Sequence, residues 1–158
     1  MEKIWAPWRM QYILSEKKSG CIFCEKAQES EDRGNYILFR DTLGFVIMNI
    51  FPYNNGHLMI APYRHAASLE ELSSEELFQI MTLTKKSVAC LQEAMKADGY
   101  NIGMNVGAVA GAGIADHLHL HIVPRWCGDT NFMPVLADIK VLPQHLDTTY
   151  DILKPLFR

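Results

Sequence analysis

The chain has 158 residues, of which 49% are hydrophobic and 21% are charged, a balance typical of a soluble globular domain. This length fits one domain, residues 1–158, with enough chain to bury a core. The 15 basic and 18 acidic residues leave a net charge of −3, which gives no electrostatic case for binding duplex nucleic acid or an anionic membrane surface. A local basic pocket for a phosphate group remains compatible with this balance.

The N-terminal sequence and the cysteines indicate the compartment. Residues 1–18 lack the charged-then-apolar pattern of a signal peptide, and no apolar run approaches the roughly 18 residues that a transmembrane helix needs. We therefore expect a cytoplasmic protein. In that reducing compartment thiols or metal ligands are expected in place of disulfides at Cys21, Cys24, Cys90 and Cys127.

The first 35 residues are predicted to hold an arm and solvated connectors, one of which is SEKKSG at residues 15–20. Residues 1–20 hold Trp5 and Trp8 around a proline, and such a segment is expected to be an arm packed on the domain or on a neighbouring subunit. The polar stretch EKAQESEDRGN, residues 25–35, is expected to be a solvated connector.

Three short strands are predicted next, at residues 36–39, 44–49 and 57–62. The cluster PYNNG between the second and the third has turn chemistry, because Asn and Gly tolerate positive φ. We therefore expect these two strands to pair in antiparallel fashion.

A long helix is predicted from Ser73, which forms a capping-box pattern with Glu76, up to Gly99. Its buried face is expected at the apolar residues that recur at steps of three and four, namely Leu77, Ile80, Met81, Val88, Leu91 and Met95. Two further strands are predicted at residues 101–106 and 117–123. Strands, a long helix and strands again, with hairpin-length links, predict an α+β fold with a mostly antiparallel five-stranded sheet, one long helix and a shorter helical segment.

The stretch ADHLHLHIVPRW, residues 115–126, places three of the six histidines at alternate positions. In a strand these three share one face, and the intervening apolar residues Leu118, Leu120 and Ile122 fill the core. A neutral imidazole can be a nucleophile, a general base or a metal ligand. The row is therefore open to three interpretations: a catalytic row, a site for one metal ion, or ordinary surface or core histidines.

A glycine-rich loop, NVGAVAGAGIAD at residues 105–116, precedes the row. Glycines let backbone N–H groups approach an anion closely. Because the loop ends at the row, it predicts that phosphate oxygens are held where a histidine can attack. After the row, Arg125 is a candidate charge partner and Trp126 a candidate wall of the site.

The pattern His117-Leu-His119-Leu-His121-Ile-Val resembles the histidine triad (HIT) nucleotide-binding family. The segments CIFC, NGHLMIAPYRH and MNVGAVAGAGIADH are similar to other motifs of that family, in the expected order and spacing over residues 21–126. The flanks IWAPWRMQYI and PRWCGDTNFMPVLADIKVLPQHL resemble the diadenosine tetraphosphate (Ap4A) phosphorylase branch. The resemblance divides the chain into an arm (1–20), a HIT core (21–126) and a C-terminal extension (127–158).

The resemblance implies a role for each matching residue. His119 would be the nucleophile that attacks the α-phosphorus and forms an adenylyl-histidine intermediate, with His121 and His57 at the phosphate site. Asn49 would contact the ribose. The adenine would be enclosed by Phe23, Ile47 and Ile50. Phosphate oxygens would be held by Asn105 and by the backbone of Ala112 and Gly113, and Trp126 would belong to the same pocket.

The implied reaction is the conversion of Ap4A and inorganic phosphate into ADP and ATP, carried out by a homodimer. Two alternatives stay open: hydrolysis of dinucleoside polyphosphates or adenosine phosphoramidates, and a non-catalytic nucleotide-binding module. The intact pair of His119 and His121 favours an enzyme. One departure from the family affects the leaving group. Many members carry Gln-Ser or Gln-Thr before the triad, whereas residues 111–116 here are Gly-Ala-Gly-Ile-Ala-Asp, so backbone amides or Asp116 must take that role.

The CxxC pair Cys21 and Cys24 supplies two of the four ligands that a structural zinc ion needs. In zinc-containing HIT members the other two are histidines whose positions match His65 and His117. The resemblance therefore implies a Cys2His2 zinc site, in which His117 is a ligand and not a catalyst.

Overall fold

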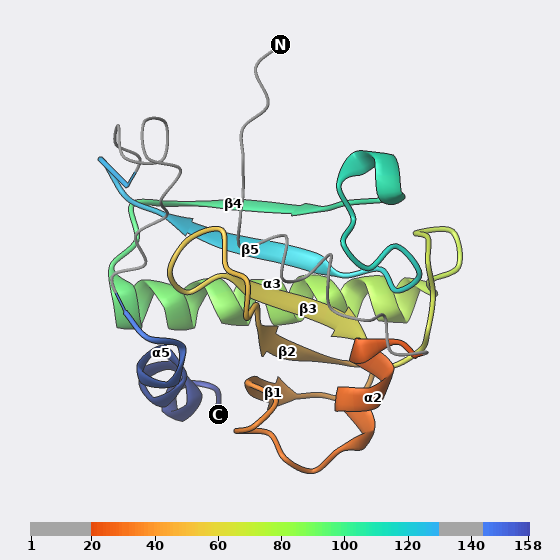
Figure 1. The fold of residues 1–158 in the computed structure, drawn as a ribbon, viewed down its shortest axis with the longest axis horizontal. Helices are drawn as coiled ribbons and strands as arrows, with labels where there is room; N and C mark the ends of the chain where they lie inside the picture. Colours follow the sequence, from red (N-terminus) through yellow and green to blue (C-terminus); the bar gives the residue numbers. More distant parts are fainter. Residues whose placement is uncertain (1–19, 130–143) are drawn as a thin grey trace.

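Five antiparallel strands form a single sheet in the computed structural model, which describes residues 20–129 and 144–158 (Figure 1). The strands lie in the order β1-β2-β3-β5-β4, and each neighbouring pair is antiparallel. The elements in chain order are α2 (Ile22–Gln28), β1 (Ile37–Arg40), β2 (Gly44–Met48), β3 (Leu58–Pro62), α3 (Ser74–Met95), β4 (Gly99–Met104), the 3-10 turn η1 (Ala108–Ala110), β5 (Leu120–Arg125), α5 (Leu146–Leu153) and the 3-10 turn η2 (Lys154–Leu156). The predicted α+β class, with five antiparallel strands and one long helix, is confirmed.

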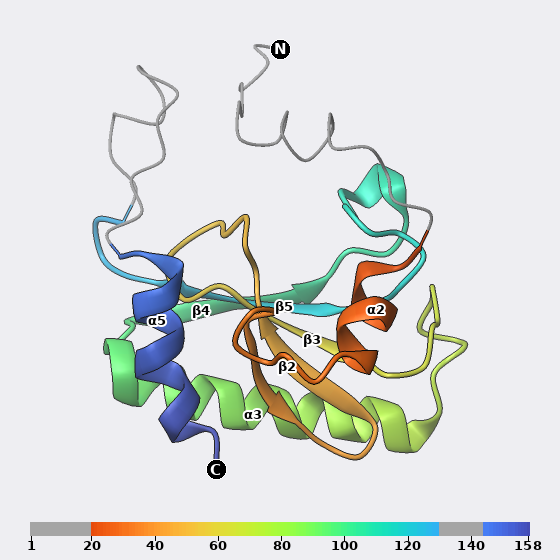
Figure 2. The same cartoon turned by 60° about the horizontal axis from the view of Figure 1, so that its bottom comes forward.

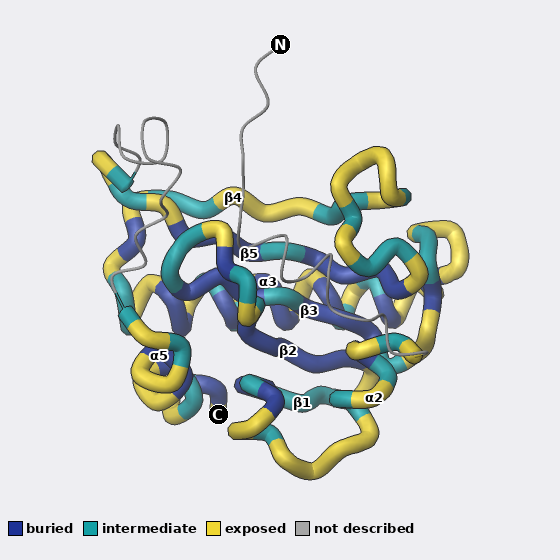
Figure 3. The backbone as a smooth tube through the Cα atoms, in the orientation of Figure 1, coloured by how far each residue is buried: buried dark blue, intermediate teal, exposed yellow. Residues whose placement is uncertain are grey.

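The two faces of β2 pack against different layers. Val46 and Met48 belong to the large core cluster that includes the buried face of α3, whereas Phe45 and Ile47 pack with Phe23 of α2. Every residue of β2 is buried, as Figure 3 shows for the centre of the sheet. Burial on both faces explains why GFVIM is a continuous apolar run and does not alternate with polar residues. Figure 2 shows α3 running along one face of the sheet.

The predicted capping box at the start of α3 is present. The Ser73 hydroxyl accepts a hydrogen bond from the Glu76 amide, and the Glu76 carboxylate accepts one from the Ser73 amide at 2.8 Å. The helix ends before the predicted Gly99, because Lys96 adopts the left-handed conformation with φ 51° and Gly99 is already the first residue of β4.

The buried face of α3 is rotated relative to the prediction. Met81 was expected inside but is 57% exposed, and the core instead takes Leu83, Ser87 and Cys90. These three follow Ile80 at steps of three and four, whereas Met81 lies about 100° further around the helix. Apolar character alone therefore gave the wrong face at this position.

The polar stretch after the CxxC is not a simple connector, because residues 25–28 belong to α2. Arg40 of β1 explains why this short helix is stable. Its guanidinium donates to the backbone carbonyls of Lys26, Ala27 and Glu29, and to the carboxylate of Asp32 at 2.8 Å. These carbonyls are the acceptors that the C-terminal end of a helix leaves without partners. A side chain distant in sequence thus caps α2.

The strand that was predicted from His117 begins later, at Leu120. Leu118 donates its amide to Ala66 and not to a neighbouring strand, and the pairing with β3 starts at Leu120. The alternation nevertheless holds through the whole row, since Leu118, Leu120 and Ile122 are all buried in the core.

The last residues complete the core, because Tyr150, Leu153 and Phe157 pack into the same cluster as α3. The predicted arm around Trp5 and Trp8 lies outside the described residues, as do residues 130–143 of the C-terminal extension. In the part of the chain that is described, no helix combines the length and apolarity required to cross a membrane.

Candidate active site

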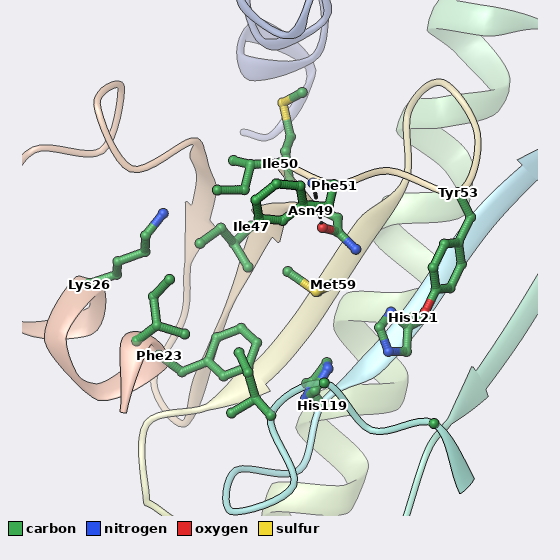
Figure 4. Close-up of a pocket in the computed structure, with 15 residues that line it drawn as sticks. Phe23, Lys26, Ile47, Asn49, Ile50, Phe51, Tyr53, Met59, His119 and His121 are labelled. Atoms are coloured by element: carbon green, nitrogen blue, oxygen red, sulfur yellow. Dashed lines mark hydrogen bonds between the residues drawn. The ribbon is translucent and has the colours of Figure 1, made fainter. Parts of the chain in front are cut away.

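One pocket opens between α2, the C-terminal end of β2 and the glycine-rich loop before β5 (Figure 4). Its walls are formed by Ile22, Phe23, Lys26, Ile47, Met48, Asn49, Ile50, Phe51, Tyr53, Met59, Gly111, Gly113, Ile114, His119 and His121. The structure therefore brings together most of the residues that the sequence predicted for catalysis and nucleotide binding, namely Phe23, Ile47, Asn49, Ile50, Gly113, His119 and His121.

His119 lies immediately before β5, where the glycine-rich loop joins the sheet. Its Nδ1 is 2.8 Å from the carbonyl oxygen of His117. A carbonyl oxygen can only accept, so Nδ1 carries the proton and Nε2 keeps its lone pair. The residue is 5% exposed, and this burial lowers the pKa of His119, so that the ring is neutral near pH 7. A neutral imidazole with a lone pair on Nε2 has the form that a nucleophile requires.

The protonation of His57 and His121 follows from a backbone donor. The Tyr53 amide donates to Nδ1 of His57 at 3.0 Å, so the proton of the neutral His57 ring is on Nε2. That Nε2 is 2.9 Å from Nδ1 of His121 and donates to it. The proton of neutral His121 is therefore on Nε2. The site presents a lone pair on His119 beside an N–H donor on His121, a combination suited to attack on phosphorus and to stabilising phosphate oxygens.

Burial and the neighbouring His119 lower the pKa of His121 to about 4. The two rings are close, with centroids 4.7 Å apart in an edge-to-face arrangement. His121 is consequently neutral over the physiological pH range, and it acts on a phosphate as a hydrogen-bond donor and not as a fixed positive charge.

Asn49 follows β2 and lies between the apolar part of the pocket and the histidines (Figure 4). Its Oδ1 accepts from the Phe51 amide at 2.9 Å, and its Nδ2 is 3.3 Å from Nδ1 of His57. The apolar part is made by Phe23, Ile47 and Ile50, and the Phe23 ring packs 4.8 Å from the His119 ring. The pocket therefore has an apolar end at these side chains and a polar end at the histidines.

The glycine-rich loop contributes less of its backbone than predicted. Gly111 and Gly113 line the pocket, but the Ala112 amide donates to the carbonyl of Gly107 within the loop, and Asn105 donates its side-chain amide to the carbonyl of Gly111. Positive φ values of 84° at Gly107 and 90° at Gly111 explain why glycine is needed there. Asp116 is exposed and does not line the pocket.

Trp126 is not brought to this pocket within the described chain. Its indole N–H donates to the carbonyl of Met95 at 3.2 Å, and its ring lines a second hollow with Asn55 and Ile152. Arg125 pairs with Asp129 at 2.7 Å and does not reach the histidines. Both residues follow the row closely in sequence, but β5 carries them to the far end of the sheet.

The two cysteines of the CxxC and two histidines converge on one point. Cys21 Sγ and Cys24 Sγ lie 3.2 Å and 3.6 Å from Nδ1 of His117, and Cys24 Sγ lies 3.4 Å from Nδ1 of His65. All four ligand atoms are within 4.8 Å of one another. The usual Zn–S and Zn–N lengths at a tetrahedral angle place sulfur and nitrogen roughly 3.6 Å apart. The donor set and its spacing therefore fit a tetrahedral zinc ion.

His117 is oriented for that role. Its Nε2 donates to the carbonyl of Pro62 at 2.9 Å, which leaves the lone pair of Nδ1 facing the cysteines. His119 and His121 face the pocket instead. The three histidines of the row therefore do not converge on a single metal ion, and that interpretation of the sequence was wrong.

Two polar residues of the pocket escaped the sequence analysis. Lys26 follows Phe23 by three positions, so a helix there places both on one face, but the polar composition of residues 25–35 predicts a connector. Tyr53 was assigned to a turn, yet its ring packs 4.7 Å from that of His57 and 5.9 Å from that of His121. The i, i+3 spacing was a usable signal for Lys26, whereas nothing local indicated the contacts of Tyr53.

Comparisons with known proteins bear on the family resemblance. The HIT domain profile matches residues 31–127. An AP-4-A phosphorylase of Mycobacterium tuberculosis is 36% identical over 162 residues, covering 97% of this chain and 83% of that protein. An adenosine 5′-monophosphoramidase of Schizosaccharomyces pombe is 33% identical over 105 residues, covering 66% of this chain and 74% of that protein.

Among solved structures, a Zn-bound histidine triad family protein from Mycobacterium smegmatis superposes with a TM-score of 0.70 at 25% identity. The match covers 87% of this chain and 92% of that one. The profile match, the full-length relative and the shared fold agree with the resemblance found in the sequence. The chain belongs to the histidine triad (HIT) family.

Proposed function

We propose that the protein is an Ap4A phosphorylase that uses His119 as its nucleophile. The observation that carries this proposal is the complementary protonation of two rings in one pocket, with a lone pair on Nε2 of His119 and a proton on Nε2 of His121. The full-length likeness to an AP-4-A phosphorylase supports the choice of substrate. Phe23, Ile47 and Ile50 would enclose the adenine, and Asn49 would contact the ribose.

The reaction has two displacements. Nε2 of His119 attacks the α-phosphorus of Ap4A, a P–N bond forms, and the P–O bond to ATP breaks. The Nδ1–H group of His119 keeps its hydrogen bond to the carbonyl of His117, and this bond stabilises the positive charge that the modified ring carries. An oxygen of inorganic phosphate then attacks the adenylyl group, the P–N bond breaks, and ADP leaves with His119 neutral again. His121, oriented by His57, donates to the phosphate oxygens in both steps.

The decisive experiment follows the products of Ap4A turnover with and without inorganic phosphate. ADP and ATP formed only with phosphate support phosphorolysis, and AMP and ATP formed regardless of phosphate contradict it. His119→Ala should abolish turnover in protein that still unfolds cooperatively, although the loss of a buried ring will lower its melting temperature. His145→Ala is the matched control, because His145 is exposed at the start of α5, outside the pocket.

Hydrolysis of an adenosine phosphoramidate is the second candidate. The likeness to an adenosine 5′-monophosphoramidase favours it, since the same nucleophile and the same adenine-binding residues would serve both reactions. Water would then replace phosphate in the second displacement. Turnover of adenosine 5′-phosphoramidate to AMP, faster than that of Ap4A with phosphate, would select this activity.

We also propose that Cys21, Cys24, His65 and His117 hold a structural zinc ion. The clustered ligand atoms and the likeness to a Zn-bound family member support it. With four protein ligands the site would be closed, so the ion would support the fold and would not take part in the chemistry. Elemental analysis should find one zinc per chain, and fully active protein free of metal would contradict the proposal.

A homodimer is the proposed assembly. Within residues 20–129 and 144–158, β4 is an edge strand of the sheet and several of its residues are exposed, so a second copy could pair with its backbone. Analytical ultracentrifugation should give twice the chain mass of 18.0 kDa.

A further inference from the structure

Lys26 is a charged residue in the otherwise apolar part of the pocket. It extends from α2 near Ile47 and Ile50, and Figure 4 shows it at the opposite side of the pocket from His119 and His121. Its position on the same helical face as Phe23 makes it part of the wall.

A polar network holds the Lys26 ammonium group at this rim. Nζ donates to the backbone carbonyl of Asn35 at 3.3 Å. Asn35 is only 9% exposed, and its side-chain amide donates to the Glu29 carboxylate at 2.6 Å. Arg40 anchors the backbone of Lys26 through its carbonyl. An ammonium group has three protons and the contact with Asn35 uses one, so further protons are available for a ligand.

The position of Lys26 relative to a bound nucleotide rests on the function proposed above. The reacting phosphorus lies at His119, and the base lies among Phe23, Ile47 and Ile50. The edge of the base that is remote from the sugar then faces the rim where Lys26 lies. In a purine that edge carries the substituent at position 6, which is an amino group in adenine and a carbonyl oxygen in guanine.

We propose that Lys26 determines base specificity by donating a hydrogen bond to the position-6 edge of the base. This bond raises the affinity for 6-oxopurine nucleotides above the affinity that a pocket with an apolar residue at position 26 would have. The ammonium group is a donor only, so it complements the carbonyl oxygen of guanine directly, whereas the amino group of adenine is itself a donor and leaves only a neighbouring ring nitrogen to accept. The side chains of Phe23, Ile47 and Ile50, which form the apolar wall, carry no hydrogen-bond donor, and a buried carbonyl without one is costly. The pocket therefore accepts guanine nucleotides as well as adenine nucleotides because Lys26 is present.

Calorimetric titration with GMP and AMP tests this without any need for turnover. Lys26→Met keeps the length and apolar stem but removes the donor, and Lys26→Arg keeps a donor. Lys26→Met should weaken GMP binding about tenfold more than AMP binding, the scale of one hydrogen bond from a charged donor. Lys26→Arg should retain most of the GMP affinity. Lys85→Met, on the exposed face of α3, is the matched control and should change neither affinity.

The outcomes separate this proposal from the one on which it rests. An unchanged ratio of GMP to AMP affinity in Lys26→Met, or equal weakening of both, overturns the role of Lys26 and leaves the nucleotide site intact. AMP binding by the variant also shows that its pocket is folded. Failure of the wild-type protein to bind either nucleotide overturns the proposed function, and the role of Lys26 with it.

Discussion

The protonated nitrogen differs among the clustered histidines because each ring has a different hydrogen-bond partner. These histidines are His57, His117, His119 and His121. A backbone carbonyl fixes the proton on Nδ1 of His119, whereas a carbonyl at Pro62 fixes it on Nε2 of His117. The Tyr53 amide fixes the proton of His57 on Nε2, and the hydrogen bond from that Nε2 fixes the proton of His121 on its own Nε2. The group that lies against one ring nitrogen thus decides which nitrogen carries the proton, and this difference underlies the proposed roles of nucleophile, donor and metal ligand.

The depressed pKa of His121 makes stability depend on pH. The folded state binds this proton only near pH 4, whereas an unfolded histidine binds it near pH 6.5. Between these values the unfolded state holds more protons, so the contribution of His121 to the free energy of unfolding is complete above pH 6.5 and is lost as pH falls toward 4. The loss is at most on the order of 3 kcal/mol.

Urea unfolding at pH 5.0 and pH 7.5 measures this effect. His121→Asn keeps an acceptor for His57 but does not titrate, so its stability should fall less between the two pH values than that of wild type. Other groups titrate in both proteins, so the contribution of His121 is the difference between wild type and variant in how far the free energy of unfolding decreases. An equal decrease in both proteins would contradict the lowered pKa of His121.

At the scale of elements, the short helix α2 links the cluster of Cys21, Cys24, His65 and His117 to the pocket. Cys24 and Phe23 are neighbours on it, and the Phe23 ring packs against both His117 and His119, with centroids 5.2 Å and 4.8 Å away. A helix of 7 residues is too short to be stable alone. Its position depends on Arg40 at one end and on the Cys2His2 cluster at the other.

Arg40→Met should therefore loosen the wall of the pocket without touching the histidines. The variant loses hydrogen bonds to three carbonyls at the end of α2, so unfolding should become easier by roughly 2 kcal/mol. The KM for nucleotide should rise more than kcat falls, because His119 and His121 lie outside the change. Arg33→Met, which removes an exposed ion pair with Asp151, serves as the control. An unchanged KM in Arg40→Met would show that α2 holds its place without this cap.

For the whole molecule, the proposed zinc ion joins segments that are far apart in sequence. Cys21 and His117 are separated by 96 positions, so the ion would tie the start of the described chain to the segment that carries His119. Metal bound only to the folded state stabilises it by mass action.

Cys24→Ala should lose zinc and lower the melting temperature, because three ligands remain and a closed tetrahedral site needs four. Cys90→Ala is the matched control: Cys90 is buried in the core away from the cluster, so this variant should retain its zinc whatever it loses in packing. Differential scanning calorimetry with parallel metal analysis gives both quantities. Retention of one zinc per chain in Cys24→Ala would contradict the ligand set.

Local patterns were enough for much of the fold and for the membership of the site. Period-two alternation placed His119 and His121 opposite the core, and the capping box placed the start of α3, because both patterns depend on neighbours within a few residues. The CxxC and the histidine row, with the family resemblance, led to the ligand set that the cluster reproduces. The rotated face of α3 and the helical character of residues 25–28 were missed, since packing and a distant arginine override local polarity there.

The protonation of each histidine, the place of Lys26 and the separation of Trp126 from the pocket depend on contacts between distant segments. The hydrogen bonds from Tyr53 to His57 and from His57 to His121 join the loop before β3 to β5. Lys26 of α2 and Ile47 of β2 line the same pocket, and β5 carries Trp126 away from His119. A one-dimensional pattern specifies which face a side chain takes but not what lies against that face. The order of strands in the sheet specifies that, and with it the chemistry of each ring.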